Sequence, residues 1–129
     1  MNIPADLMYT KDHEWIRVEG KIGIIGITDY AQHQLGDIVF VELPPVGKKA
    51  AKGDVLATVE SVKAVSEIYA PVSGTVIQVN STLTDSPEKL NQDPFGEGWV
   101  AKMEITSSDE LNTLFDAAAY EKYLGEAKK

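Results

Sequence analysis

The stretch GDVLATVESVKAVSEIYAPVSGTV, residues 53–76, decides the fold of this chain. Two runs rich in strand-favouring residues, 53–61 and 65–70, stand on either side of Lys63 and are typical of a hairpin. The turn signal PVSG at 71–74 then separates them from a further β run at 75–80. This rhythm of short strands and Gly- or Pro-containing turns predicts a small β-sandwich or barrel.

The flanking sequence continues the same pattern. The following elements are expected: a hairpin of 15–18 and 21–28 turning at Glu19-Gly20, a short helix over 29–36 capped by Thr28 or Asp29, and a strand from 38 to 43 that ends before Pro44. Gly23 and Gly26 weaken the second strand of that hairpin and indicate a close approach or a bulge.

Beyond residue 80 the pattern changes toward helix. Ser86 and Pro87 predict a short helical turn over 86–90, residues 91–99 read as a loop, and 99–105 read as one more strand. The spacing from Ser107 to Glu110 is that of a capping box, which predicts a C-terminal helix beginning there. The 129 residues are therefore expected to form one mainly β domain, 1–129, with an N-terminal hairpin, short helices and a C-terminal helical extension.

Composition excludes several classes of function. The net charge is −8, from 20 acidic and 12 basic residues, which argues against a nucleic-acid surface and is compatible with docking onto basic patches of partner proteins. The chain has no cysteine, so disulfides, zinc-thiolate sites and thiol nucleophiles are excluded. The sequence shows neither a secretory signal nor an apolar run of membrane-spanning length. A cytoplasmic location is expected, or the mitochondrial matrix if a transit peptide has been removed.

Catalytic patterns are absent from the sequence. His13 and His33, without cysteine, are too few to indicate a metal site and are interpreted as surface residues. No serine lies in a nucleophile elbow, and neither Gly23-x-x-Gly26 nor Gly96-x-Gly98 has the spacing of a phosphate loop. The sequence alone therefore gives no reason to expect an enzyme.

Lys63 is the unusual residue that remains. It is expected at the tip of a hairpin, yet its neighbours Val62, Ala64 and Val65 are apolar or small rather than the Gly, Asn or Asp usual in turns. One interpretation is a solvated surface lysine. The other is a lysine presented for acylation, which would remove its charge and suit apolar neighbours.

Residues 53–76 resemble the region around the modified lysine in lipoyl and biotinyl carrier domains. The fuller resemblance is to the H protein family of the glycine cleavage system, carried by segments that keep the same order along almost the whole chain: KDHEW (11–15), GITDYAQHQLGDIVFVELPPVG (26–47), ESVKA (60–64), YAPVSG (69–74) and DPFGEGW (93–99). That resemblance implies a lipoyl/biotinyl-type barrel-sandwich hybrid. It also implies a monomeric carrier that has no catalytic activity and binds neither nucleic acid nor membrane.

The resemblance further implies a cofactor and a set of partners. Lipoate would be attached to Lys63 in amide linkage by a lipoate ligase or a lipoyl/octanoyl transferase. The carrier would take the aminomethyl group of glycine from a pyridoxal-phosphate-dependent glycine decarboxylase to a tetrahydrofolate-dependent aminomethyltransferase. Dihydrolipoamide dehydrogenase would then reoxidise the dithiol.

Three carboxylates are assigned to roles around this arm. In the family, a carboxylate of the HEW segment is associated with sheltering the aminomethyl cation, and the matching residue is Glu14. Glu67 is a second residue near the arm that fits that role, although Val65 and Glu67 make the stretch after Lys63 bulkier than the resemblance implies. Glu60, three residues before Lys63, is expected to help the lipoylating enzyme select this lysine. A solvated surface position remains the alternative for each of the three.

Two other functions stay open from the sequence. A biotin carrier would use the same hairpin, but its lysine usually lies between methionines, whereas Val62 and Ala64 flank Lys63. An unmodified lipoyl-like protein could instead act in lipoate relay or as a binding module.

Overall fold

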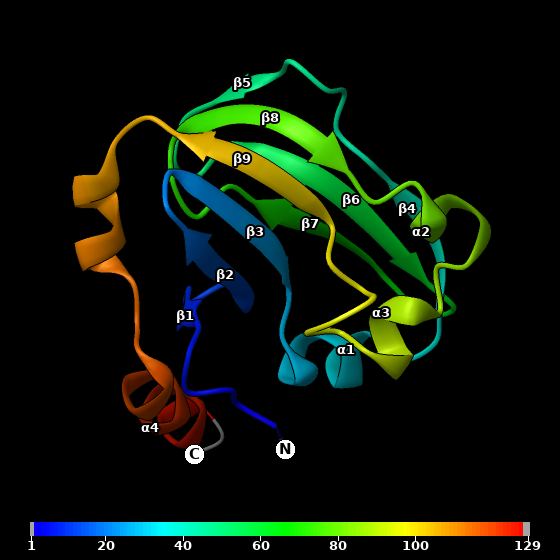
Figure 1. Ribbon diagram of the computed structural model, residues 1–129. Helices are drawn as coiled ribbons and strands as arrows, with labels where there is room; N and C mark the ends of the chain where they lie inside the picture. The colour runs from blue at the N-terminus through cyan, green and yellow to red at the C-terminus, as the bar shows by residue number, and fades with distance from the viewer. Residues whose placement is uncertain (1, 128–129) are drawn as a thin grey trace.

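The computed structural model describes residues 2–127 and consists mainly of antiparallel strands in two sheets, with short helices and one longer C-terminal helix. The larger sheet has the strand order β1-β2-β3-β9-β8-β5, with bounds Met8–Tyr9, Glu14–Glu19, Ile22–Ile27, Ala101–Ile105, Gly74–Val79 and Lys49–Ala50. The smaller sheet has the order β4-β6-β7, with bounds Ile38–Glu42, Val55–Ser61 and Val65–Tyr69. The two sheets lie one behind the other in Figure 1.

The helices lie around the ends of this sandwich (Figure 1). They are α1 Asp29–Leu35, α2 Thr82–Asp85, α3 Lys89–Gln92, a 3₁₀ helix over Ser108–Thr113 and α4 Ala117–Ala127. The prediction for α1 is confirmed, because Thr28 Oγ1 accepts a hydrogen bond from the Ala31 amide and Gly36 ends the helix with a φ of 75°. The hairpins of β2 with β3 and of β6 with β7 are also confirmed.

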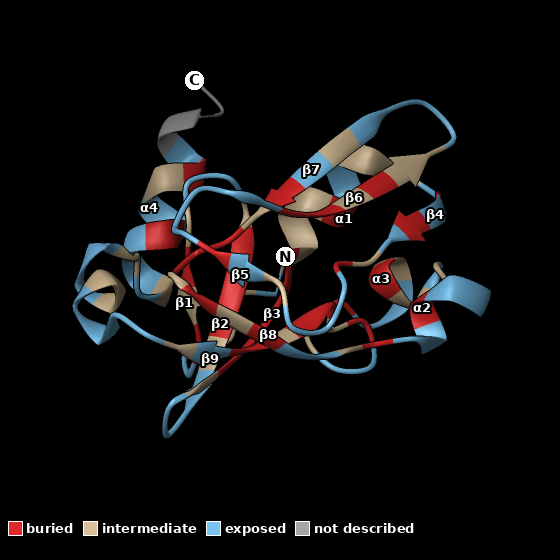
Figure 2. Cartoon of the chain, turned by 90° about the horizontal axis from the view of Figure 1, so that it is seen from above, coloured by how far each residue is buried: buried red, intermediate tan, exposed pale blue. Residues whose placement is uncertain are grey.

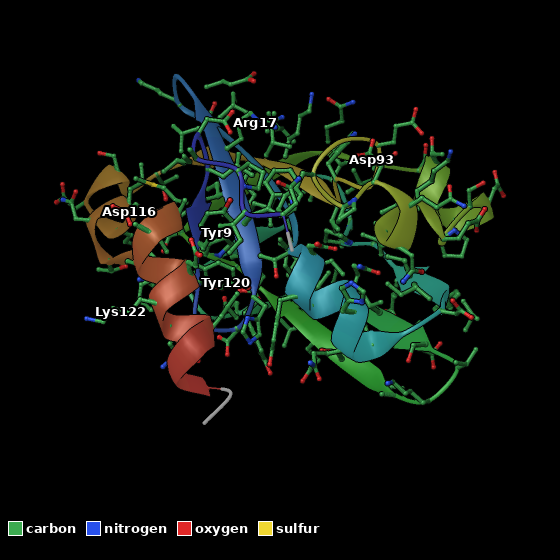
Figure 3. All side chains as sticks on the ribbon, turned by 90° about the horizontal axis from the view of Figure 1, so that it is seen from below. Tyr9, Arg17, Asp93, Asp116, Tyr120 and Lys122 are labelled. Carbon is green, nitrogen blue, oxygen red and sulfur yellow. The ribbon has the colours of Figure 1, made fainter. Side chains whose placement is uncertain are left out.

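Two hydrophobic clusters hold the layers together. The first fills the space between the sheets with aliphatic side chains from both, including Ile25, Leu56, Val59, Ile68 and Met103. The second is aromatic and joins the N-terminal hairpin to α4: Leu7, Tyr9, Trp15, Ile24, Tyr120 and Leu124. Figure 3 shows Tyr120 on the side of α4 that faces Tyr9, and Lys122 pointing away.

The glycines of β3 mark close approaches rather than a bulge. Trp15 and Gly26 are directly opposite in the ladder, and a Cβ at Gly26 would lie 2.7 Å from the indole. A Cβ at Gly23 would lie 2.7 Å from Ile16 Cδ1 in the same way. Each glycine therefore makes room for a large side chain on the neighbouring strand.

The predicted start of the C-terminal helix is wrong. Ser107 makes no side-chain cap, and Glu110 instead accepts hydrogen bonds from the Ser73 amide (2.6 Å) and the Ser73 hydroxyl (3.0 Å). Phe115 then runs extended, because its backbone pairs with that of Tyr9 through two 2.8 Å hydrogen bonds. The α-helix can therefore begin only at Ala117.

The helical turn predicted at 86–90 is shifted. The helix α3 begins at Lys89, and Ser86 accepts a backbone hydrogen bond from the Lys89 amide instead of capping the helix with its side chain. Residues 91 and 92, predicted as loop, belong to this helix. The short helix α2 was not predicted, since residues 82–85 carry neither an apolar period nor a cap signal.

Candidate functional site

Lys63 lies in the turn between β6 and β7, where it is exposed. Figure 2 shows this hairpin reaching away from the body of the molecule, with an exposed tip. Among residues 2–125, whose side chains the structure describes, none makes a hydrogen bond or an ion pair with the Lys63 amine. The aliphatic part of its side chain lies beside Gly36, where a Cβ would be 3.6 Å from Lys63 Cε. The amine is therefore presented without a partner that would compete for it.

The backbone of the tip is held by hydrogen bonds despite its exposure. The Ser61 amide donates to the Ala64 carbonyl at 2.8 Å, and Ser61 Oγ accepts from the amides of Ala64 (3.0 Å) and Lys63 (3.3 Å). The Val62 amide donates to the Asp37 carbonyl at 3.0 Å, which joins the tip to the segment between α1 and β4. This turn fixes the direction in which Lys63 leaves the hairpin.

Asn91 in turn holds the segment on which the tip rests. Its Oδ1 accepts from the Ile38 amide at 2.9 Å, and its Nδ2 donates to the Gly36 carbonyl at 2.8 Å and to Gln32 Oε1 at 3.1 Å. One side chain of α3 thus satisfies polar groups of α1, of the turn after it and of β4. The sequence did not predict this role, because residue 91 was expected to lie in a loop.

At the other end of β7 lies a cleft of about 350 Å³. Four segments line it: the turn before β2, the loop at Lys52 and Gly53, the end of β7 from Tyr69 to Pro71, and the segment from Thr113 to Phe115 that leads to α4. Lys52 Nζ donates a hydrogen bond to Thr113 Oγ1, which joins two of these walls. The tip and the cleft therefore lie at opposite ends of β7, which begins at Val65 beside the tip and ends at Tyr69 beside the cleft.

Glu14 lines the cleft and is almost completely buried, with 2% of its surface exposed. Thr10 Oγ1 donates to Glu14 Oε1 at 2.5 Å, and the Tyr69 amide donates to Oε2 at 3.2 Å. Burial raises the pKa of this carboxyl from 4.5 to about 7, although both hydrogen bonds lower it. A carboxyl of this kind changes between its neutral and charged forms near neutral pH, and a cation placed in the cleft would favour the charged form.

Glu67 and Glu14 are brought together through Tyr69. Glu67 is exposed on β7, two residues before Tyr69 and on the same face of the strand. Its negative charge raises the pKa of the Tyr69 hydroxyl, while the Tyr69 amide binds Glu14. Glu14 therefore lines the cleft at the Tyr69 end of β7, whereas Glu67 lies outside the cleft lining, two residues before Tyr69.

Glu60 lies elsewhere. It is opposite Val65 on β7 and Phe40 on β4, so it belongs to the outer face of the three-stranded sheet, close to Lys63. Its side chain is half-buried between those two neighbours. Glu60 does not line the cleft, and on the outer face of this sheet it lies one row nearer the tip than Glu67.

His13 is not the surface residue that the sequence suggested. It adopts a φ of 70°, its ring lies 4.5 Å from that of Tyr30, and its Nδ1 is 2.9 Å from the Tyr120 hydroxyl. That hydroxyl also contacts Thr28 Oγ1 at 2.8 Å, so one hydrogen-bonded chain joins α4 to the start of α1. Burial lowers the pKa of His13, which favours the neutral ring. His33 is exposed as expected, and the side chains described, those of residues 2–125, form no cluster of three or more acidic or imidazole groups that could hold a metal.

Comparison with known proteins decides the family. The model of the family described as "Glycine cleavage H-protein" matches residues 7–127. A glycine cleavage system H protein of Symbiobacterium thermophilum is 58% identical over 125 residues, 97% of this chain and 98% of that protein. A probable glycine cleavage system H protein of Thermococcus gammatolerans is 61% identical over 125 residues, 95% of this chain and 92% of that one. The crystal structure of an H protein from Mycobacterium marinum superposes with a TM-score of 0.85 at 38% identity, covering 98% of this chain and 100% of that chain.

The chain belongs to the glycine cleavage H-protein family.

Membership confirms the predicted fold and the predicted place of the chain as a carrier component of the glycine cleavage system. The H-protein fold seen here is the barrel-sandwich hybrid that the resemblance implied, with its short helices and C-terminal helix. In residues 2–127, no helix is long and apolar enough to cross a membrane.

Within this H-protein fold, sequence reasoning missed the residues that support the site. Tyr69 and Thr10 bind Glu14, Tyr120 closes the aromatic cluster, and Asn91 supports the tip. Three of the four act through groups distant in sequence, so no local spacing marks them. Only Thr10 is close in sequence to its partner, four residues before Glu14. Local hydrogen bonding of a threonine side chain over such a short distance is common, so this contact could have been predicted from the sequence.

Proposed function

We propose that this chain is the lipoate-carrying shuttle of the glycine cleavage system, with lipoate in amide linkage to Lys63. The observation that carries the proposal is an exposed amine on a hairpin tip whose backbone is fixed by Ser61 and Asp37, in a chain of the H-protein family. The tip holds the attachment point still, while the arm beyond it is free to turn.

The surroundings of Lys63 fit such a group. In the attachment step, the Lys63 amine attacks an activated lipoyl carboxyl, an amide forms, the activating group leaves and the amine loses a proton. The product is neutral, and the exposed apolar neighbours Val62 and Val65 suit a neutral arm better than a charged lysine. When bound, lipoate supplies a disulfide that can be reduced and a sulfur that carries the aminomethyl group.

The cleft at the end of β7 is the proposed shelter for the cargo. From Val65 to Tyr69, β7 spans about 13 Å, four steps of about 3.3 Å each. A lysine with lipoate is a tether on the order of ten Å or more. An arm that starts at Lys63 therefore extends along most of β7, and the cleft of about 350 Å³ at its end has room for a small group. The walls of the cleft would keep water away from the aminomethyl group.

Glu14 is the proposed partner of the aminomethyl cation in that cleft. Its buried carboxylate can accept a charge-assisted hydrogen bond from a protonated amine. Because its pKa is about 7 without a cation, bringing a positive charge into the cleft ionises Glu14 and releases a proton near neutral pH. Glu67, exposed and next to the Tyr69 hydroxyl, is the proposed second carboxylate on the way into the cleft.

The partners follow from the proposed role. A glycine decarboxylase would load the arm, an aminomethyltransferase would unload it, and dihydrolipoamide dehydrogenase would restore the disulfide. A lipoate ligase or a lipoyl/octanoyl transferase would attach the group. The chain itself would catalyse none of these steps, and we infer that it acts as a single-domain monomer in the cytoplasm or the mitochondrial matrix.

The proposal is tested by the mass of the protein after incubation with lipoate, ATP and a lipoate ligase. We expect one lipoyl adduct, located on the peptide that contains Lys63 and absent from Lys63→Arg. Lys21→Arg, at an exposed lysine of the β2–β3 turn, is the matched control and should be modified normally. The modified protein should then support glycine-dependent exchange of bicarbonate by a glycine decarboxylase. Failure of the unaltered protein to gain the lipoyl adduct, or a lipoyl adduct without exchange activity, would overturn the proposal.

A further inference from the structure

Half of the exposed large apolar side chains lie at one place in the molecule. Eight such residues are exposed among residues 2–127, and four of them, Val39, Phe40, Val62 and Val65, lie at the Lys63 tip or in the strand beside it. Their exposed fractions run from 47% to 68%. Gathered apolar surface of this kind marks a site of interaction more often than apolar residues scattered singly.

The register of the smaller sheet places two of these four side chains, Phe40 and Val65, in one row. Phe40, Glu60 and Val65 are directly opposite one another across β4, β6 and β7, so their side chains share one face of the sheet. The next row on this face is Glu42, Thr58 and Glu67. The alternate residues Val41 and Val59 point into the core, which makes the first two rows the outer face. We call these two rows the tip face.

The tip face is acidic as well as apolar. Residues 37–42 and 58–69 hold Asp37, Glu42, Glu60 and Glu67, while Lys63 is the only basic residue in these two segments. A face on which apolar side chains and carboxylates are neighbours is complementary to a partner surface that combines apolar depressions with basic side chains.

We propose that the tip face is the docking surface for the enzyme that attaches the acyl group to Lys63. The inference rests on the proposed function and adds the surface that its first step requires. An unmodified lysine side chain reaches only about 6 Å from the backbone. An enzyme that acylates this amine must therefore bring its active site against the tip and cover the rows next to it. Enzymes that act on the finished arm can stay farther away.

The tip face also explains why one lysine is chosen. Lys21, Lys48 and Lys52 are exposed or partly exposed in turns as well, but none of them stands beside paired exposed Phe and Val side chains on a sheet. Glu60 lies opposite Phe40 on one neighbouring strand and Val65 on the other, so the backbone of the sheet places its carboxylate between these two apolar positions. An enzyme that chooses its lysine by binding a surface needs the side chains of that surface in a fixed arrangement. It depends less on the particular sequence around the lysine.

The test uses the full unmodified chain and a purified lipoate ligase with lipoate and ATP. Phe40→Thr and Val65→Thr remove the apolar surface while keeping residues that favour strands. The matched control is Ile77→Thr, an exposed isoleucine on β8 of the other sheet that is 42% exposed. We expect each tip-face variant to lower the modification rate at limiting carrier concentration about tenfold. The control should stay within about twofold, and thermal unfolding should show that all three variants fold.

Two further measurements separate this proposal from its alternatives. Glu42→Lys should slow modification at low salt, and the difference should shrink at high salt. Phe40→Thr and Glu42→Lys, once fully lipoylated by long incubation, should support glycine–bicarbonate exchange at nearly the rate of the unaltered protein. Equal losses in modification and exchange would make the tip face a surface for all partners and overturn the assignment to the acylating enzyme. Normal modification of both threonine variants would overturn the docking surface itself, whereas failure of the unaltered protein to be modified would overturn the proposed function instead.

Discussion

The Lys63 tip and the Glu14 cleft lie at opposite ends of the same strand and are built in opposite ways. The tip is exposed, and its order comes from a few backbone hydrogen bonds around Ser61. The cleft is formed by four segments, and its carboxylate is buried beneath hydrogen bonds from Thr10 and Tyr69. The amine makes no polar contact among residues 2–125, whereas each oxygen of Glu14 has a donor.

This difference follows from what each group is proposed to do. A lysine that an enzyme must acylate has to be accessible, and little packing can depend on its side chain. A carboxylate that is to hold a cation away from water must be buried before the cation arrives, which costs stability in the unloaded protein. The tip should therefore tolerate substitution without loss of stability, whereas the fully packed part of β2 that carries Glu14 and Trp15 should not.

The largest expected contrast compares Trp15→Ala with Lys63→Ala. Trp15 has no exposed surface, packs on Gly26 and donates from Nε1 to the Pro94 carbonyl at 2.9 Å. We expect its truncation to lower the free energy of unfolding by about 3–5 kcal/mol. Lys63→Ala should change it by less than about 0.5 kcal/mol, as is usual at surface positions. Urea unfolding of both variants measures the contrast, and a loss above about 1 kcal/mol for Lys63→Ala would show that the tip contributes to stability.

The second prediction concerns the pH dependence of stability. The pKa of Glu14 is raised from 4.5 to about 7 in the folded state, so between these values the folded protein binds more protons than the unfolded chain. Stability should therefore fall as pH rises from about 4.5 to about 7 and then level off, with a Glu14 contribution of about 3 kcal/mol.

Glu14→Gln isolates this contribution, because glutamine does not titrate. The difference in unfolding free energy between the variant and the unaltered protein, measured by urea titration from pH 4.5 to 8, should follow the same curve. Glu67→Gln, at an exposed carboxylate of the same strand end, is the control and should leave the curve unchanged. A flat difference for Glu14→Gln would mean that Glu14 is ionised throughout and is not held neutral by its burial.

The third prediction concerns Asn91, whose hydrogen bonds hold the segment that contacts the tip. Asn91→Ala removes the acceptor of the Ile38 amide and the donor to the Gly36 carbonyl. Buried polar groups left without partners typically cost about 1–3 kcal/mol, and we expect a loss in that range. Gln34→Ala, at an exposed position of α1, is the matched control.

Hydrogen exchange distinguishes a local effect of this substitution from a general one. In Asn91→Ala, the amides of Ile38 and Val62 should lose protection more than those of β3 and β9, because Val62 bonds to the segment that Asn91 holds. Equal loss of protection everywhere would assign Asn91 to the stability of the whole fold and not to the support of the tip.

The local signals in the sequence predicted the local structure well. Thr28 and Gly36 bound α1 as expected, the hairpin around Lys63 forms, and Pro44 follows the end of β4 at Glu42. Each of these features depends on neighbours in the chain, which a cap, a turn or a proline marks directly.

The errors arise where a distant group competes with the local one. The capping box at Ser107 does not form because Glu110 binds Ser73, 37 residues away. His13 was expected at the surface but packs against Tyr120, 107 residues away in the sequence. The same reason applies to Glu14. The family resemblance assigned a role to its carboxylate, but the sequence could not predict its burial. Tyr69 and the other walls of the cleft come from distant parts of the chain.

The smallest expected effect is on the pKa of the Tyr69 hydroxyl. Tyr69 stands at the end of β7 that lines the cleft, so its titration tests the boundary between the exposed strand and the cleft. The charge of Glu67 raises the pKa of this hydroxyl, so Glu67→Gln should lower it toward the ordinary value for tyrosine. Tyr120, whose pKa burial raises to about 12, ionises later and should not interfere with the early part of the titration. The tyrosinate absorbance of Glu67→Gln, read as a difference from the double variant that also carries Tyr69→Phe, gives the value. Stability should change by less than about 0.5 kcal/mol, because both side chains are accessible to water. An unchanged Tyr69 titration would mean that the Glu67 carboxylate turns away from the cleft, leaving Glu14 as the one carboxylate proposed to meet the cargo.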